Sequence, residues 1–163
     1  YQPISAVAIP PFMYEAIERA SIEVGMFAHG LTYSGHPVAA TVALRTLELY
    51  EERGIVEHAA KMGEILQSKL SRLADHPLVG NYRGIGLIAG LELVRDPATR
   101  TRFEPSDKIA FQATAACLEE GLVVRALPGD TVAICPPLII DEAGIDELVG
   151  KLARGLDRTL NGL

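Results

Sequence analysis

A glycine-flanked segment ahead of a long helical pattern contains the first residues whose types and spacing could bind a ligand. The segment Gly30–Pro37 reads Gly-Leu-Thr-Tyr-Ser-Gly-His-Pro, and the helical pattern Val38–Arg53 follows it directly. The start of a helix offers unpaired N–H groups and a partial positive charge, which together favour an anion. Thr32 adds a hydroxyl donor just before the turn. The segment therefore predicts a phosphate site or, alternatively, an ordinary capped helix that binds nothing.

A second candidate is Arg125, a long cation inside the otherwise apolar strand pattern Leu122–Ala126. The planar guanidinium can bind a carboxylate through two parallel hydrogen bonds. The position therefore predicts a carboxylate site. The alternative is a half-buried strand arginine paired with a structural acid such as Asp130.

The histidines, the cysteines and a short glycine motif give no further candidate for a catalytic or ligand-binding site. None of the four histidines stands at metal-ligand spacing from another histidine or from a cysteine, so we expect no metal site. Cys117 lies on an apolar helix face and Cys135 in a strand pattern, which favours a packing role for both. The letters of 84–89 match a dinucleotide-binding motif, but these glycines open a strand and predict only a tight turn.

Composition narrows the class of protein. The chain has 163 residues, 48% of them hydrophobic, which suits a globular chain with a real core. Its 15 basic and 21 acidic residues give a formal net charge of −6, and no basic cluster points to a nucleic-acid partner. We expect no membrane span, since no apolar run is long enough. Two cysteines favour a reduced, cytoplasmic compartment over a disulfide framework.

The elements that would position Thr32 surround the long helical pattern. Pro37 suits its first position, because the N–H that proline lacks would have no partner there, and Ser34 or Gly35 is the expected cap. The first half of this helix is apolar nearly all round and predicts burial, whereas its second half is acidic. Gly54 should end it. Before it we expect a short buried strand over 4–9, a short helix over 11–20 and a loop over 21–35.

The elements that would position Arg125 read as a small sheet with helices on one face. Ser106 and Asp141 are expected helix caps, and Gly121 is an expected helix stop. A Pro-Gly-Asp turn at 128–130 separates two strands. The expected elements are a helix over 55–73, extended structure over 79–94, a helix over 107–120, strands over 122–126 and 131–135, and a helix from 142.

Three stretches together resemble the class III aminotransferases, which are pyridoxal 5'-phosphate enzymes. They are 30–40, 83–93 and 121–138, and they follow one another in the family's order. The resemblance implies the α/β fold of type I pyridoxal-phosphate transferases, which is aspartate-aminotransferase-like. Residues 1–50 would be the C-terminal end of the large cofactor-binding domain with the interdomain helix. Residues 51–163 would be the small C-terminal α+β domain.

The resemblance also implies site residues. Thr32, with the main chain of Leu31, would bind the cofactor phosphate in the active site of the neighbouring subunit of a homodimer. Arg125 would bind the substrate carboxylate, as in the ω-amino acid:pyruvate and amine:pyruvate branch. Relatives that act on ornithine or 4-aminobutyrate usually carry an arginine at the position of Cys135, which argues against that branch.

The resemblance implies an activity that this chain alone cannot perform. The family's catalytic lysine is expected just upstream of Tyr1, so we predict no catalytic residue here and an inactive isolated chain. The complete enzyme would move an amino group from an amine or ω-amino acid to a keto acid such as pyruvate. Two alternatives remain: an aminomutase or decarboxylase of the same fold, and a truncated, non-catalytic interaction module.

Overall fold

The computed structural model describes residues 2–163, which divide into two compact units. The first unit ends at Arg53, and the second runs from Gly54 to Leu163. Within the described residues no helix has both the length and the apolar character needed to cross a bilayer. The assignment of residues 1–50 to a large cofactor-binding domain stays a prediction.

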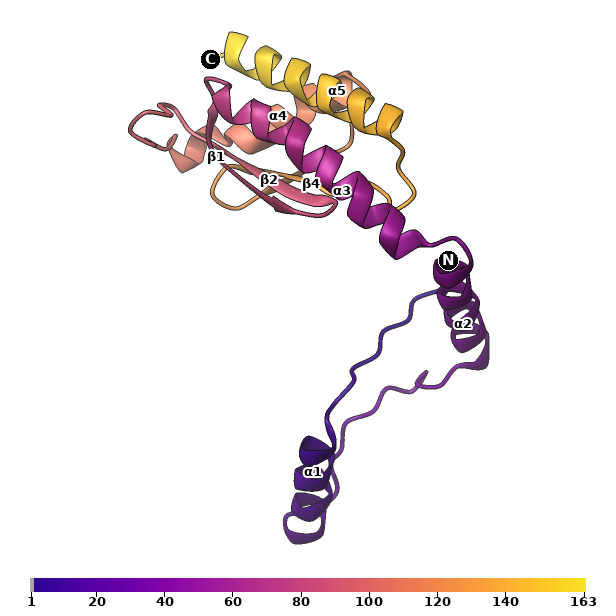
Figure 1. Ribbon diagram of the computed structural model, residues 1–163. Coiled ribbons are helices and arrows are strands. Elements are labelled where there is room, and N and C mark those ends of the chain that lie inside the picture. The colour runs from indigo at the N-terminus through magenta and orange to yellow at the C-terminus, as the bar shows by residue number, and fades with distance from the viewer. Residues whose placement is uncertain (1) are drawn as a thin grey trace. The chain divides into compact units, whose positions relative to one another are not determined.

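The first unit consists of two helices joined by extended segments (Figure 1). Helix α1 spans Pro11–Glu23 and α2 spans Pro37–Glu52, and neither contains a buried residue. The predicted helix over 11–20 is thus confirmed and continues for three more residues. The strand predicted over 4–9 is wrong. Residues 2–10 form no secondary structure and are exposed, because no other strand of the described chain pairs with them.

For α2 the predicted first position and the predicted stop are confirmed, whereas the predicted cap and the predicted burial are wrong. Pro37 occupies the first helical position and Gly54, with a φ of +57°, follows the last turn, both as expected. The cap is wrong: His36 holds that position and its side chain makes no capping bond. Ser34 instead accepts a hydrogen bond from the Leu31 N–H at 3.3 Å. The predicted burial is also wrong for this chain, since the apolar side chains of α2 are exposed or only half-buried.

The second unit is built on a four-stranded antiparallel sheet in the order β1-β2-β4-β3. The strands are β1 Val79–Ile85, β2 Ile88–Leu93, β3 Arg125–Leu127 and β4 Thr131–Ile134. The stretch predicted as extended over 79–94 is a hairpin that reverses at Gly86, whose φ is +54°, so the tight turn is confirmed. Strand β3 starts later than predicted, and the turn at 128–130 is confirmed.

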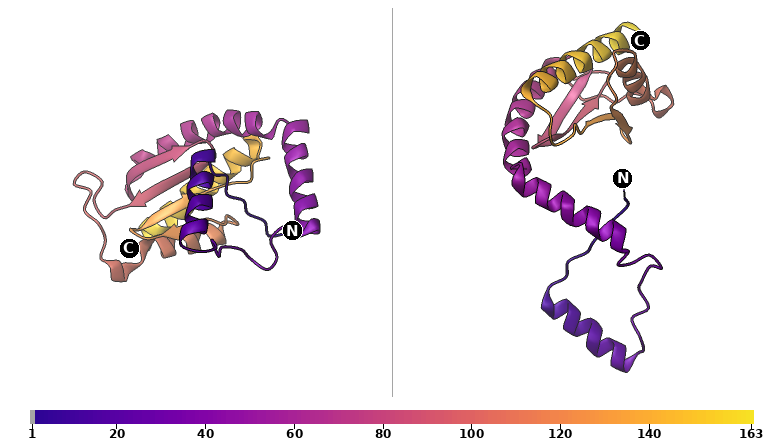
Figure 2. Two further views of the ribbon diagram at one scale, coloured as in Figure 1. Left: turned by 90° about the horizontal axis from the view of Figure 1, so that it is seen from below. Right: turned by 90° about the vertical axis from the view of Figure 1, so that its right-hand side faces the viewer.

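Three helices cover one face of this sheet (Figures 1 and 2). They are α3 Ile55–Ser71, α4 Ile109–Glu119 and α5 Glu142–Asn161, and short 3-10 segments occupy Arg72–Asp75 and Pro105–Asp107. Their apolar stripes meet alternate residues of β2, which gives one continuous core, as the periodicities predict. Fully buried members of this core include Leu66, Leu70, Leu91, Ile109, Ile134, Ile145, Leu152 and Leu156.

Two helix termini in this unit match the local sequence signals. The Asp141 carboxylate accepts a hydrogen bond from the Gly144 N–H at 2.8 Å and caps α5. Gly121, with a φ of +76°, ends α4. There the Leu122 N–H reaches the Cys117 carbonyl at 2.9 Å, as in a Schellman motif. Both predictions are confirmed, because each depends on residues only a few positions apart.

The start of α4 differs from the prediction. Ser106 lies in the 3-10 segment and Lys108 precedes the first turn, yet neither side chain caps the helix. The acceptor comes instead from the β3–β4 turn. The carboxylate of Asp130 accepts the Ala110 N–H at 3.0 Å.

Helices α4 and α5 approach each other closely where Cys117 faces Gly155. A Cβ atom on Gly155 would lie 2.5 Å from the Cys117 sulfur and 3.1 Å from its Cα, so glycine is required there. The Cys117 side chain is fully buried, and burial raises the pKa of its thiol to about 11. Cys117 is therefore a packing residue, as predicted.

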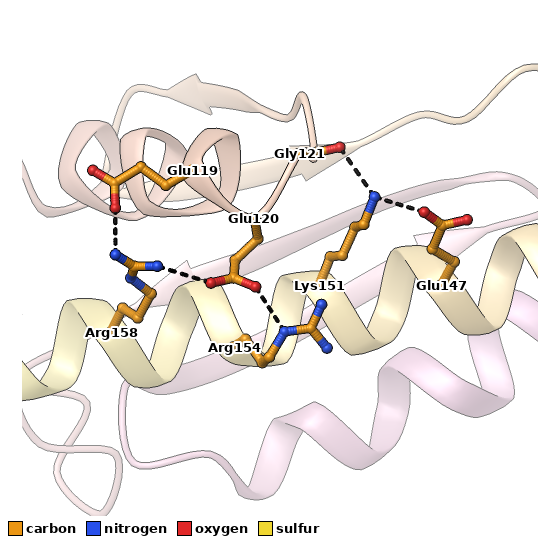
Figure 3. A network of polar contacts seen from close by, with 7 residues as sticks. All are labelled: Glu119, Glu120, Gly121, Glu147, Lys151, Arg154 and Arg158. Atoms are coloured by element: carbon orange, nitrogen blue, oxygen red, sulfur yellow. Dashed lines mark hydrogen bonds and ion pairs between the residues drawn. The ribbon is translucent and has the colours of Figure 1, made fainter.

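A charged network joins the same two helices outside the core (Figure 3). Glu120, at the C-terminal end of α4, accepts hydrogen bonds from Arg154 at 2.7 Å and Arg158 at 2.9 Å. Arg158 also bonds Glu119 at 2.5 Å. Hydrogen bonds from Arg154 and Arg158 lower the pKa of Glu120 below its ordinary value. The network therefore favours the ionised carboxylate in the folded chain.

Replacing Gly155 by Ala should destabilise the second unit by about 1–3 kcal/mol, because the new methyl group overlaps Cys117. Gly150→Ala is the matched control on the same helix. A Cβ at Gly150 would meet only the flexible end of Arg154 at 3.6 Å, and alanine favours the helix. Urea unfolding of both variants measures the difference. Equal stability for the two would contradict the close approach of α4 and α5.

Replacing Glu120 by Gln should lower the melting temperature at pH 7, and the difference should shrink in acid. Because the pKa of Glu120 is lower in the folded state, its contribution is present above the ordinary glutamate pKa of about 4.3. It is lost as the pH falls through the lower folded value. Thermal unfolding from pH 3 to 7 measures this. Glu147→Gln, which breaks an exposed pair with Lys151 within α5, should have a smaller effect.

Candidate functional site

The segment before α2 folds into two successive turns that leave Thr32 exposed. The Ser34 N–H bonds the Leu31 carbonyl at 2.9 Å, and the His36 N–H bonds the Tyr33 carbonyl at 3.2 Å. Thr32 lies inside the first turn. Its hydroxyl forms no hydrogen bond with any residue that the structure describes, so it is free to donate to a ligand.

The first turn of α2 beside it fits an anion. Within residues 2–163 the N–H groups of Val38 and Ala39 have no partner, and the first turn contains no acidic residue. Free N–H groups and the helix dipole attract a phosphate, and no carboxylate repels it. An open crevice of about 570 Å³ adjoins the turn, lined by Pro3, Ile4, Ser5, Leu31, Tyr33, Ser34, Gly35, His36, Ala39 and Ala40. The free N–H groups and the Thr32 hydroxyl fit a phosphate, although Thr32 itself does not line the crevice.

Arg125 is the first residue of β3 and lies opposite Ala133 of β4. The residue is exposed, and no carboxylate in the described part of the chain lies within ion-pair distance of its guanidinium. The alternative pairing with Asp130 does not occur, because that carboxylate bonds the Ala110 N–H. Arg125 therefore has its full set of donors available for a carboxylate ligand.

The neighbours of Arg125 in the sheet leave it room. Its partner Ala133 pairs in turn with Gly90 of β2, and Gly90 pairs with Arg83 of β1. This row lies on the face that α3, α4 and α5 do not cover, because the alternate residues of β2 face the core. Neither alanine nor glycine restricts the arginine side chain. Periodicity alone could not find this row, since it depends on strand pairing.

Other candidates contribute no site. Cys135 is exposed, so its predicted packing role is wrong for this chain. His58 is half-buried and its Nε2 lies 2.7 Å from the Ile140 carbonyl, a structural contact. Among the described residues no three His, Cys, Asp or Glu side chains gather as metal ligands would. Thr32 and Arg125 lie in different units.

Comparison with known proteins identifies the family. The model of the family described as aminotransferase class-III matches residues 2–156. The chain belongs to the class III aminotransferases. Enzymes of this family depend on pyridoxal 5'-phosphate and share fold type I, so the predicted α/β fold class, family and cofactor are confirmed. The roles of Leu31, Thr32 and Arg125 stay predictions.

The relatives of this class III aminotransferase chain are longer than it is. The diaminobutyrate–2-oxoglutarate transaminase of Halomonas elongata is 39% identical over 100% of this chain and 35% of that protein. The putrescine–pyruvate aminotransferase of Pseudomonas aeruginosa is 43% identical over 98% of this chain and 34% of that protein. The chain thus spans about a third of the length of the curated relatives it matches.

Solved structures agree with this assignment. The omega transaminase of Pseudomonas jessenii in complex with PMP is 44% identical, with a TM-score of 0.83 over 91% of this chain and 33% of that one. A transaminase with L-ala is also 44% identical, with a TM-score of 0.86 over 94% of this chain and 36% of that one.

Proposed function

We propose that this chain is the C-terminal part of an aminotransferase that moves an amino group from an amine or ω-amino acid to a keto acid such as pyruvate. The observation that carries the proposal is the exposed guanidinium of Arg125, which has no carboxylate partner in the described chain. Both amino acids and keto acids bring such a carboxylate.

In this proposal Arg125 binds the carboxylate of the keto acid. The guanidinium fork matches a carboxylate in two parallel bonds, which fixes the orientation of the substrate as well as its charge. The small neighbours Ala133 and Gly90 would let the side chain move aside for an uncharged amine. Pyruvate as the acceptor is supported by the related transaminase with L-ala, since pyruvate is the keto acid that becomes alanine when it accepts an amino group.

Thr32 and the main chain of Leu31 are proposed to hold the phosphate of pyridoxal 5'-phosphate. The cofactor supplies the electron sink that the reaction needs. The free hydroxyl of Thr32 and the free N–H groups at the start of α2 would donate hydrogen bonds to its phosphate. The lysine that shuttles the proton is proposed to lie outside this chain, which would leave the chain inactive by itself.

A homodimer in the cytoplasm is part of the proposal, with Thr32 contributing to the site of the neighbouring subunit. The first unit supports the proposal of a second subunit, because α1 and α2 contain no buried residue and leave their apolar side chains available for contact. Exposed apolar surface on this scale marks an interaction surface. Residues 1–50 would then complete the large domain, and 51–163 would form the small domain.

The two alternatives are less well supported. The named relatives are transaminases, which favours transamination over an aminomutase or a decarboxylase. A mutase needs no external keto acid, so dependence of the amine reaction on pyruvate separates these enzymes. The second alternative, a truncated non-catalytic interaction module, requires that the complete protein fail to bind the cofactor.

Replacing Arg125 by Ala in the complete enzyme should raise the apparent KM for pyruvate about tenfold or more and leave the KM for an uncharged amine nearly unchanged. The reason is the loss of charge-assisted hydrogen bonds to the carboxylate. Initial rates with each substrate varied in turn measure the split. Arg72→Ala, which removes an exposed arginine of the second unit, is the control. Equal rises for both substrates would contradict the role of Arg125.

Replacing Thr32 by Ala in the complete enzyme should weaken binding of pyridoxal 5'-phosphate about tenfold, whereas Thr32→Ser should retain it. A hydrogen bond to a charged phosphate is lost in the first variant only. Titration followed by visible absorption measures the affinity, and an unmodified enzyme without any visible band would contradict the cofactor proposal itself. Thr41→Ala is the matched control, because that hydroxyl already bonds the Pro37 carbonyl at 2.8 Å.

A further inference from the structure

We propose that Asp130 is a positioning residue that holds Arg125 in place for the substrate carboxylate. The inference rests on the proposed role of Arg125. It concerns a residue that lies five positions further along the chain and does not contact the guanidinium in an ion pair.

Asp130 is attached to two other elements at once. Its side-chain carboxylate accepts the Ala110 N–H at 3.0 Å, which fixes the turn to the first turn of α4. Its main-chain carbonyl accepts the Leu93 N–H at 2.8 Å, which fixes the turn to the end of β2. Both Ala110 and Leu93 are buried core residues. The turn is therefore anchored to the rigid interior.

Strand β3 depends on this turn more than the other strands do. It contains only Arg125–Leu127 and lies at the edge of the sheet, and among the described strands it pairs with β4 alone. The register that sets Arg125 opposite Ala133 starts at the pair Leu127 and Thr131, directly across the turn. A displacement of the turn would therefore move Arg125 with it.

The residue type at 130 matters for two reasons. Asp130 adopts a left-handed conformation with a φ of +50°, which aspartate and asparagine tolerate better than most residues. Its carboxylate also replaces the local cap that α4 lacks, since no side chain near Lys108 caps this helix. A negative charge at a helix start interacts favourably with the dipole. Alanine would lose both properties, whereas asparagine keeps the acceptor oxygen and the backbone tolerance.

The test compares Asp130→Ala, Asp130→Asn, Arg125→Ala and Asp141→Ala in the complete enzyme. Asp141 is the matched control because it caps α5 through the same kind of bond, 2.8 Å to the Gly144 N–H. Asp130→Ala should raise the apparent KM for pyruvate about tenfold, as expected for a misplaced binding group, with kcat and the KM for an uncharged amine within about twofold of the original values. Asp130→Asn and Asp141→Ala should leave the pyruvate KM within about twofold.

A second measurement does not depend on activity. In the complete enzyme, Asp130→Ala should speed hydrogen exchange at the amides of Ala110 and Leu93 and in the β3–β4 pair. Asp141→Ala should speed exchange only at the start of α5. This readout applies even to a variant of the complete enzyme whose activity is too low to measure a KM.

The outcomes separate this inference from the proposed function. If Arg125→Ala itself leaves the pyruvate KM unchanged, the carboxylate role of Arg125 is wrong and this inference falls with it. If Arg125→Ala has its expected effect while Asp130→Ala has none, or raises both KM values equally, Asp130 is only structural and this inference alone is overturned. Unchanged exchange in the β3–β4 pair would overturn it as well.

Discussion

The second unit depends on the burial of one face of its sheet beneath α3, α4 and α5. Each fully buried leucine or isoleucine, such as Leu91 or Ile134, contributes about 1.5–3 kcal/mol relative to an exposed side chain. Because all three helices lie on the same face, the other face of the sheet receives no cover from them. That one-sidedness leaves Arg125 exposed and available for a ligand.

The start of α4 is capped by a residue that is distant in the sequence. Its buried stripe of Ile109, Ala110, Ala113 and Cys117 holds the helix against α5, but no neighbouring side chain caps its start. Asp130 supplies that acceptor, and in doing so it joins the helix layer to the edge of the sheet. A single carboxylate thus links the packing of the core with the strand that carries Arg125.

The first unit, unlike the second, is not organised around a buried core in the described structure. Its helices contain no fully buried residue in the described structure, and its candidate ligand groups are unpaired donors at Thr32 and at the start of α2. The apolar residues of α2 have the pattern of a core helix without a core around them in the described chain. The curated relatives that this chain matches are about three times as long as the matched part.

The sequence by itself determined the helices, several of their caps and stops, and the candidate ligand groups. The stripes of α3 and α5, the cap at Asp141, the stop at Gly121 and the turn at 128–130 all depend on residues a few positions apart. Only the tertiary structure decided the hairpin at 79–94, the failure of a strand to form over 4–9, the cap on α4 and the unpaired state of Arg125. Those features require partners that are distant in the sequence, and local patterns do not show which distant groups meet.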